Sequence, residues 1–258
     1  MSSENTNTFN KENLNTYLGE LAKQYRKLCG KTVKAEIILV GGAAVLANYD
    51  FRDMTTDVDA LIQATSSMKD AINIVGDKYN LPNGWLNADF THTASFSRKL
   101  VQYSQYYRTF SNVLQVRTVN AEYLVAMKLM SGRQYKHDLS DVIGILVEHL
   151  EKGAPLTLAD IERAVVELYG AWEMLPATSQ SFIRSAMEHS NLRRVYAQIN
   201  RSEQEAKSIL VSFEERYPGV TTQENVNDIL ANARAKAASK ASLLDELKAK
   251  RKSGRDAR

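Results

Sequence analysis

The sequence predicts an α+β fold, in which a half built of short strands and helices is followed by a helical half. Two observations predict it. Three short runs rich in apolar and β-branched residues lie in the first half, at residues 35–40, 58–62 and 112–119. From residue 120 onward, apolar residues instead recur at three- and four-residue spacing, the period of amphipathic helices. We therefore expect a short mixed sheet with helices, followed by an α-helical C-terminal domain.

The composition is that of an ordinary globular protein. Of the 258 residues, 44% are hydrophobic and 24% are charged, which excludes disordered and collagen-like chains. The N-terminus is polar and lacks the apolar core of a signal peptide. No apolar stretch reaches the roughly 20 residues that cross a bilayer, and Cys29, the lone cysteine, has no intramolecular partner for a disulfide. We expect a cytoplasmic protein with no membrane partner.

The formal net charge of +3 is unevenly distributed along the chain. Residues 231–258 hold nine Lys or Arg against three acidic residues, so this tail is +6 and the rest of the chain is −3. Such a tail is either a solvated, fraying helix end or an electrostatic arm for RNA. We expect three parts: an α/β domain over 1–119, a helical domain over 120–230 and a basic helical or frayed tail over 231–258.

Periodicity and turn residues predict the elements of the first half. Leu and Tyr residues at helical spacing indicate a first helix that ends near Gly30. A β-branched run that stops at a Gly-Gly pair indicates a buried strand and a tight turn. Ser66 or Ser67 can cap the last helix of this half. The expected elements are helices over 10–29, 43–49 and 66–79 and strands over 35–40 and 58–62.

The second half of the chain follows an irregular segment, and its elements are predicted from the same kinds of signal. Residues 85–111 are rich in aromatic and hydroxyl side chains without a clean period, so they predict no element. In residues 112–119 the odd-numbered side chains, which include Gln115 and Arg117, would face opposite to the even-numbered ones, and this alternation indicates a strand. Two capping boxes mark helix starts, Thr157 with Asp160 and Thr221 with Glu224. The other expected helices cover an apolar stripe over 139–150 and residues 179–189 and 192–217.

The strongest chemical signal lies in residues 38–62, ILVGGAAVLANYDFRDMTTDVDALI. Gly41 and Gly42 lack a β-carbon and let backbone N–H groups approach a phosphate chain where a helix begins. Asp57 and Asp59 are two residues apart on a strand, so both carboxylates project from one face and need a cation between them. Hard oxygen ligands of this kind suit Mg²⁺, which completes its shell with nucleotide phosphates and water.

Each half of this signal has a simpler alternative. A glycine pair also occurs in plain strand-to-helix turns, and two acids on an edge strand are also found as solvated surface carboxylates. The apolar residues around Asp57 and Asp59 favour a metal site, because a mostly buried strand rarely carries two unpaired acids.

Together these residues resemble the signature of the DNA polymerase β nucleotidyltransferase superfamily: a strand, Gly-Gly or Gly-Ser, a helix, and Asp-apolar-Asp on the next strand. Residues 52–56 (RDMTT) look like the R-x-T-x-D-h-D approach of bacterial toxin-type members of the AbiE and MNT kind. Residues 123–146, YLVAMKLMSGRQYKHDLSDVIGIL, are similar to a later helical motif of those families. The resemblance covers roughly residues 36–150 and implies a polymerase β-like nucleotidyltransferase domain.

What the resemblance implies is transfer of a nucleotide from an NTP to an acceptor, with Mg²⁺ or Mn²⁺ held by Asp57 and Asp59. Lys128, which interrupts an apolar run, is the implied phosphate cation. Its simpler alternative is a lysine on the solvent face of an amphipathic helix. Arg133 and Thr56 are further candidates for contacts to the nucleotide.

Asp138 and Asp141 have two interpretations. Three residues apart at a helix start, they place favourable negative charge in its first turn. The family pattern implies that one of the pair also faces the active site and orients Lys128 or acts as a base. Asp138 is the preferred candidate. Many members carry a third metal-binding carboxylate on a later strand, where this chain offers Gln115. Asp89 is the nearby substitute for that ligand.

Residues 98–110 interleave aromatic and basic side chains, which is typical of surfaces that stack bases and contact phosphates. Packing of the same rings into the core beside surface charges is the alternative. The residues concerned are Tyr103, Tyr106, Tyr107 and Phe110 with Arg98, Lys99 and Arg108.

The implied function is metal-dependent transfer of a nucleotide from an NTP to RNA, tRNA in particular. In toxin-type families this enzyme is the toxin of a toxin-antitoxin system, with a cognate antitoxin protein as its partner. A small-molecule, antibiotic-type nucleotidyltransferase is one alternative, but its acceptor needs a cleft lined with acids. A catalytically idle member that binds nucleotide as a regulatory module is another, and the missing third carboxylate supports it.

Overall fold

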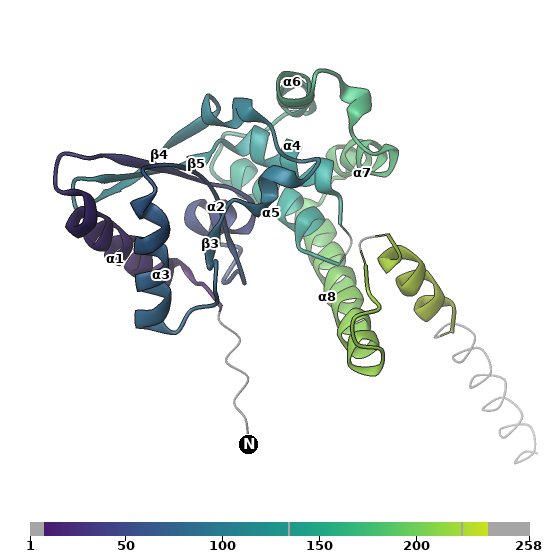
Figure 1. Cartoon of the computed structure of the whole chain (residues 1–258). Coiled ribbons are helices and arrows are strands. Elements are labelled where there is room, and N and C mark those ends of the chain that lie inside the picture. The colour runs from purple at the N-terminus through teal and green to yellow at the C-terminus, as the bar shows by residue number, and fades with distance from the viewer. Residues whose placement is uncertain (1–7, 134, 223, 237–258) are drawn as a thin grey trace, which may run out of the picture. The chain divides into compact units, whose positions relative to one another are not determined.

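The computed structural model describes residues 8–133, 135–222 and 224–236, and it is an α+β protein with a small mixed sheet (Figure 1). The expected fold class is confirmed. The helices are α1 (Lys11–Cys29), α2 (Gly41–Asn48), α3 (Ser67–Tyr79), α4 (Ala121–Ser131), α5 (Asp138–Glu151), α6 (Leu158–Tyr169), α7 (Ala177–Glu188) and α8 (Leu192–Arg216), and residues 226–236 are also helical. The strands are β1 (Ala35–Leu39), β2 (Val58–Gln63), β3 (Leu86–Asn87), β4 (Ser104–Phe110) and β5 (Leu114–Val119). The 3-10 helices are η1 (Asp89–His92), η2 (Arg98–Val101) and η3 (Trp172–Met174).

The sheet joins its strands in the order β3-β2-β1-β5-β4. β1 runs antiparallel to β2 and parallel to β5, while β3 is parallel to β2 and β4 is antiparallel to β5. Leu39 pairs with Ala60, so the end of β1 lies next to the start of β2. The turn that follows β1 therefore lies beside the residues that open β2.

One face of the sheet is covered by α1, with α3 packed against it (Figure 1). The ring of Phe110 on β4 lies in contact distance of Gly19 on α1. The registers continue this face from Phe110 through Leu114 to Ala35. Because side chains alternate along a strand, the same registers put Asp59 on the opposite face.

Most expected elements are confirmed within a few residues. The expected helices over 10–29, 43–49 and 66–79 correspond to α1, α2 and α3, and the two expected strands of this half correspond to β1 and β2. Each of these elements is buried in the core on one side or on both sides. One-sided burial leaves an apolar period in the sequence, and burial on both sides leaves a continuous apolar run. The capping box at the start of α6, formed by Thr157 and Asp160, is also confirmed.

Two expected helix caps differ from the observed ones. Ser66 stands at the N-cap of α3 but makes no side-chain capping bond, because its backbone is already helical rather than extended. The cap before the helical residues 226–236 is formed by Thr222 with Asn225, one residue later than expected. There the Thr222 N–H donates to Asn225 Oδ1 at 2.8 Å, and the Asn225 N–H donates to Thr222 Oγ1 at 3.3 Å.

The segment over 85–111, for which the sequence predicts no element, contains β3, η1, η2 and β4. β3 has two residues and is too short to show a period, and β4 is an edge strand with mostly exposed side chains. Ser111 and Asn112 both have positive φ, as a tight β-hairpin turn requires. The strand expected over 112–119 therefore begins at Leu114.

The described chain divides into two compact units. The first holds residues 8–133 and 137–199 and carries the whole sheet, and the second holds the remaining described residues. The expected basic tail lies outside the described residues from 237 onward. In the part of the chain that is described, no helix combines the length and the apolar character needed to cross a membrane.

Thr157→Ala removes the threonine side chain from the capping box of α6. Thr157 Oγ1 accepts a hydrogen bond from the Asp160 N–H at 3.2 Å. We expect the free energy of unfolding to fall by about 1 kcal/mol, measured by urea denaturation. Thr16→Ala is the matched control, because Thr16 is exposed within α1 and Ala favours helix, so its change stays within about 0.5 kcal/mol. Equal losses in both variants would contradict the capping role.

Candidate active site

The turn between β1 and α2 requires glycine at two successive positions. Gly41 has a φ of +55°, which residues with a side chain rarely adopt. A β-carbon on Gly42 would lie 2.5 Å from Oγ1 of Thr55, so no larger residue fits there without a shift. Val40 at the N-cap makes no side-chain capping bond, so the first N–H groups of α2 are left as donors for an anion.

The two carboxylates expected to bind a metal lie at the start of β2, beside this turn. Asp57 and Asp59 are half-buried, and their spacing puts both side chains on the sheet face opposite α1. Oδ2 of Asp59 is 3.6 Å from the position that a β-carbon on Gly41 would take. The Val40 N–H donates to the main-chain oxygen of Asp59 at 3.0 Å. The structure thus brings the glycine turn and the carboxylate pair together.

The hydroxyl group beside the carboxylates belongs to Thr55, whereas Thr56, expected to contact the nucleotide, is exposed. Thr55 is 3% exposed, and its Oγ1 donates to Oδ1 and to the main-chain oxygen of Asp57, both at 3.3 Å. Its main chain pairs with Phe9 through two hydrogen bonds of 2.7 and 2.8 Å. Sequence reasoning missed Thr55, although it stands in the same R-x-T approach. The pairing with Phe9, which decides which threonine points inward, leaves no mark in the sequence.

Five charged side chains form a connected and largely buried network in the first unit. Lys128 of α4 donates to Asp138 Oδ1 at 2.9 Å and lies 2.8 Å from Asp141 Oδ2, both carboxylates belonging to α5. Arg133 extends the network, since its Nε donates to Asp138 Oδ2 at 2.8 Å. Arg52 extends it at the other end, where Nη1 donates to both oxygens of Asp141 at 2.6 and 2.7 Å. Among these five side chains, three cations share two carboxylates, so Arg52, Lys128 and Arg133 all have an acidic partner.

Burial makes this network costly to disturb. Lys128, Asp138 and Asp141 are 7%, 0% and 2% exposed. Burial by itself acts to raise the pKa of Asp138, but Lys128 and Arg133 outweigh it and hold that pKa well below its usual range. Burial acts to lower the pKa of Lys128, and the two aspartates more than compensate, so its pKa is raised. Lys128 and Asp138 therefore both stay charged near neutral pH.

Asp89, expected as a third metal ligand, is exposed at the start of η1. The partner of Asp59 across β2 and β3 is Asn87, whose side chain accepts from the Asp89 N–H at 2.8 Å. Among the residues that the structure describes, no group of three or more His, Cys, Asp or Glu could hold a metal ion. The donor set that fits Mg²⁺ is the pair Asp57 and Asp59, because this ion takes one or two carboxylates and fills its shell with phosphate oxygens and water. The role of Asp89 stays a prediction.

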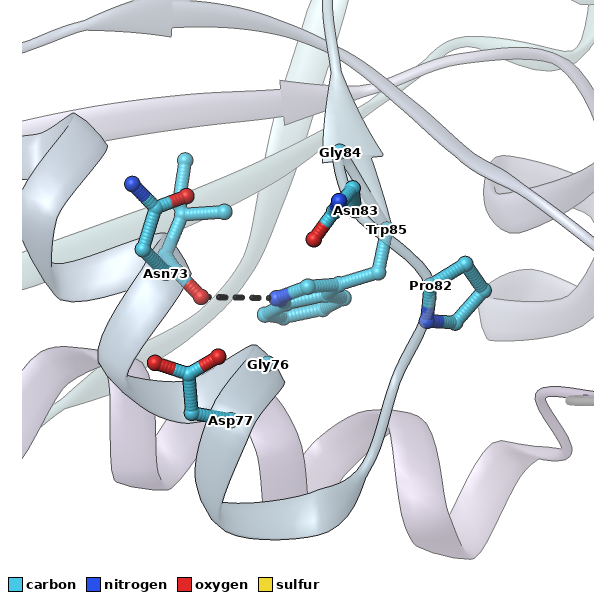
Figure 2. A pocket seen from close by; sticks show the side chains of 8 residues that line it. Asn73, Gly76, Asp77, Pro82, Asn83, Gly84 and Trp85 are labelled. Carbon is cyan, nitrogen blue, oxygen red and sulfur yellow. Dashed lines mark hydrogen bonds between the residues drawn. The ribbon is translucent and has the colours of Figure 1, made fainter.

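A pocket of about 410 Å³ lies between α3 and the turn before β3 (Figure 2). The indole of Trp85 is 3% exposed, and its Nε1 donates to the main-chain oxygen of Ile72 at 3.0 Å. Asp77 is the one charged residue in the lining that the structure describes. A lining with an acid and no cation does not suit a triphosphate.

The aromatic side chains expected to stack bases do not form one surface. Tyr103 stacks on Tyr123 with ring centroids 3.9 Å apart. The Tyr107 hydroxyl donates to α1 at 3.0 Å, and the ring of Phe110 lies against α1. Tyr106 is 63% exposed. Packing within the first unit therefore accounts for three of the four rings.

A small mixed sheet, a glycine turn at the start of a helix and an Asp-x-Asp pair facing it are features of the nucleotidyltransferase class. A family model described as a nucleotidyltransferase of unknown function (DUF6036) matches residues 16–152, just over half of the chain. The chain belongs to this family of nucleotidyltransferases, which confirms the expected class at that level. The comparisons with curated proteins and with solved structures gave no match.

Asp138→Asn tests the electrostatic role of the network. Because Lys128 and Arg133 lose a buried charged partner, we expect the free energy of unfolding to fall by about 3 kcal/mol near pH 7. The folded-state pKa of Asp138 lies below its unfolded value of about 3.9, so its stabilisation is present above that pH and is lost as the pH falls further. The difference between the variant and the wild type should therefore shrink below about pH 4.

Urea denaturation at a series of pH values measures this difference. Asp53→Asn is the matched control, because Asp53 is exposed, and its effect should stay within about 0.5 kcal/mol at every pH. A loss for Asp138→Asn that is the same at pH 7 and pH 3 would show that the charge of the carboxylate is not its source.

Proposed function

We propose that this chain is a metal-dependent nucleotidyltransferase that transfers a nucleotide from an NTP to an acceptor. The observation that carries the proposal is the position of the Asp57 and Asp59 pair at the glycine turn, with Asp59 Oδ2 3.6 Å from the β-carbon position of Gly41. Membership of the nucleotidyltransferase family supports the same chemistry. Carboxylates beside an uncapped helix N-terminus suit a triphosphate that carries a divalent ion.

Each part of the site then has a physical role. The N–H groups at the start of α2 donate to phosphate oxygens, and Gly41 and Gly42 let the phosphates come close. Asp57 and Asp59 hold Mg²⁺ or Mn²⁺, and the hydroxyl of Thr55 orients Asp57. When bound, the ion neutralises charge that develops on the phosphates. The guanidinium group of Arg52, which lies beside Gly42, acts in the same direction.

The acids of α5 serve best as groups that orient cations. Asp138 is buried between Lys128 and Arg133, and the lowered pKa of its carboxyl makes it a weak proton acceptor. Asp141 is buried against two cations, Lys128 and Arg52. We therefore place the two acids in the support of the site and not in proton transfer.

We extend the proposal to RNA, tRNA in particular, as the acceptor, and to a toxin held in check by an antitoxin protein. The support is the resemblance to toxin-type sequences and the charge of +6 in the tail over 231–258. Tyr106 and Arg108, both exposed on β4, offer a ring and a cation on the surface of the first unit. These groups suit contacts to a polyanion that carries bases.

A catalytically idle member of the family that binds nucleotide as a regulatory module is the second candidate. The observation that favours it is Asn87, an amide, at the register position next to Asp59. An acid on a neighbouring strand would supply a further negatively charged metal ligand or a base. An amide carries no charge and does not act as a base.

Incubation with each labelled NTP, Mg²⁺ and total RNA tests the proposal. We expect label on RNA with the wild type, and a loss of about a hundredfold or more in Asp57→Ala and Asp59→Ala, because each removes a metal ligand. Asp53→Ala is the matched control, since it removes an exposed acid of the same loop and should retain activity.

The outcomes separate the candidates. No label on RNA, protein or a small acceptor, combined with NTP binding that depends on Asp57 and Asp59, would support the idle module. Label on a small acceptor alone would exclude RNA as the substrate and keep the enzymatic class. Equal activity in Asp57→Ala, Asp59→Ala and the wild type would contradict the assignment of the active site.

A further inference from the structure

The guanidinium group of Arg52 lies at the glycine turn. Its Nη2 atom is 3.4 Å from the position that a β-carbon on Gly42 would take. Gly42 is the second residue of α2, so this nitrogen lies beside the N–H groups that are open to an anion. A phosphate group bound at the turn would therefore lie close to Arg52.

Two of the three guanidinium nitrogens of Arg52 are already bound. Nε donates to the main-chain oxygen of Met54 at 3.0 Å, and Nη1 donates to both oxygens of Asp141. Nη2, the nitrogen beside the turn, has no hydrogen-bond partner within the described part of the chain. The plane of the group is thus fixed, and one NH₂ group remains for a ligand.

The loop that carries Arg52 lies along one side of α5. Asp141, Gly144 and Glu148 are spaced by three and four residues, so they project from the same side of this helix. The main-chain N–H of Asp50 donates to Glu148 Oε2 at 3.0 Å. A β-carbon on Gly144 would lie 2.5 Å from the ring of Phe51, so the loop packs directly on the helix backbone there. With the arginine on Asp141, three successive loop residues are positioned by α5.

Lys128 is placed differently. Its ammonium group lies at 2.9 and 2.8 Å from two carboxylates, and the residue is 7% exposed. For Lys128 to bind a phosphate, the ammonium group would have to leave Asp138 and Asp141, both buried, each with one charged partner fewer. Its charge is already matched within the fold.

We infer that Arg52, and not Lys128, is the cation that contacts the triphosphate at the Gly41–Gly42 turn, with Asp141 as its positioning residue. The inference rests on the proposed function, because that function brings a triphosphate to the turn. The free edge of an arginine fork offers N–H groups that match phosphate oxygens in direction as well as charge.

Titration calorimetry of the full chain with inorganic tripolyphosphate and Mg²⁺, and with each of the four NTPs and Mg²⁺, tests the inference. Arg52→Gln should weaken tripolyphosphate binding by about tenfold or more, and Arg52→Lys by about threefold, since it keeps the charge but loses the fork. Lys128→Met combined with Asp138→Asn removes one charge of each sign and keeps the Arg52–Asp141 pair. This double variant should lose less tripolyphosphate affinity than Arg52→Gln, because it leaves the proposed phosphate contact in place. Arg163→Gln, at an exposed ion pair of α6, is the control.

Asp141→Asn separates positioning from a purely structural role. If Asp141 acts through Arg52, its substitution weakens tripolyphosphate binding about threefold in the wild-type chain and has no further effect in Arg52→Gln. An equal loss in both backgrounds would overturn the positioning role. Thermal melting of each variant shows that the comparison is made on folded protein.

The remaining outcomes are distinct. A wild type that binds neither tripolyphosphate nor any NTP overturns the proposed function and the inference with it. A wild type that binds, with folded Arg52→Gln binding equally well, overturns the inference alone. A larger loss in the Lys128 and Asp138 double variant than in Arg52→Gln assigns the phosphate contact to Lys128. Should Arg52→Gln fail to fold, undiminished binding by Arg52→Lys overturns the inference.

Discussion

The first unit depends on the charge balance of one buried lysine and two buried aspartates. Ionised groups are withdrawn from water at acceptable cost only if each has oppositely charged partners at hydrogen-bonding distance. Here Lys128 comes from α4, Asp138 and Asp141 come from α5, and Arg52 comes from the loop after α2. One electrostatic condition therefore joins two consecutive helices to a loop 89 positions away in the sequence. Charged hydrogen bonds also constrain direction more strongly than an apolar contact does.

The same condition sets the geometry of the candidate active site. The loop between α2 and β2 is held at one end by its contacts to α5 and at the other by the pairing of Thr55 with Phe9. Asp57 lies two residues after Thr55 and is oriented by the Thr55 hydroxyl. A metal site with only two protein carboxylates depends on their spacing, because no further protein ligands hold the ion if one carboxylate is misplaced. Buried charges on α5 thus stabilise a carboxylate pair that they do not touch.

The sequence predicts the fold where burial is one-sided or complete. Leu14, Leu18 and Leu21 on α1 are buried at helical spacing, and the run at β1 is buried on both faces, so each leaves a pattern. β4 leaves little pattern, because it is an edge strand on which residues such as Tyr106 remain exposed. β3 has two residues, and its pairing with β2 depends on the tertiary fold and not on any local preference.

In the candidate active site, too, local features are predictable from the sequence and long-range contacts are not. The glycine turn and the Asp57 and Asp59 pair are predictable because the two conditions they satisfy, close backbone approach and a shared strand face, are local. Arg52 meets Asp141 across 89 positions, so no local pattern shows that its guanidinium is anchored on one edge and open on the other. Lys128 within an apolar run indicates burial, and a buried lysine needs carboxylates. Because Asp138 and Asp141 already pair with the lysine, its ammonium group is not available to a phosphate. We therefore assign the phosphate contact to Arg52, the arginine that Asp141 orients.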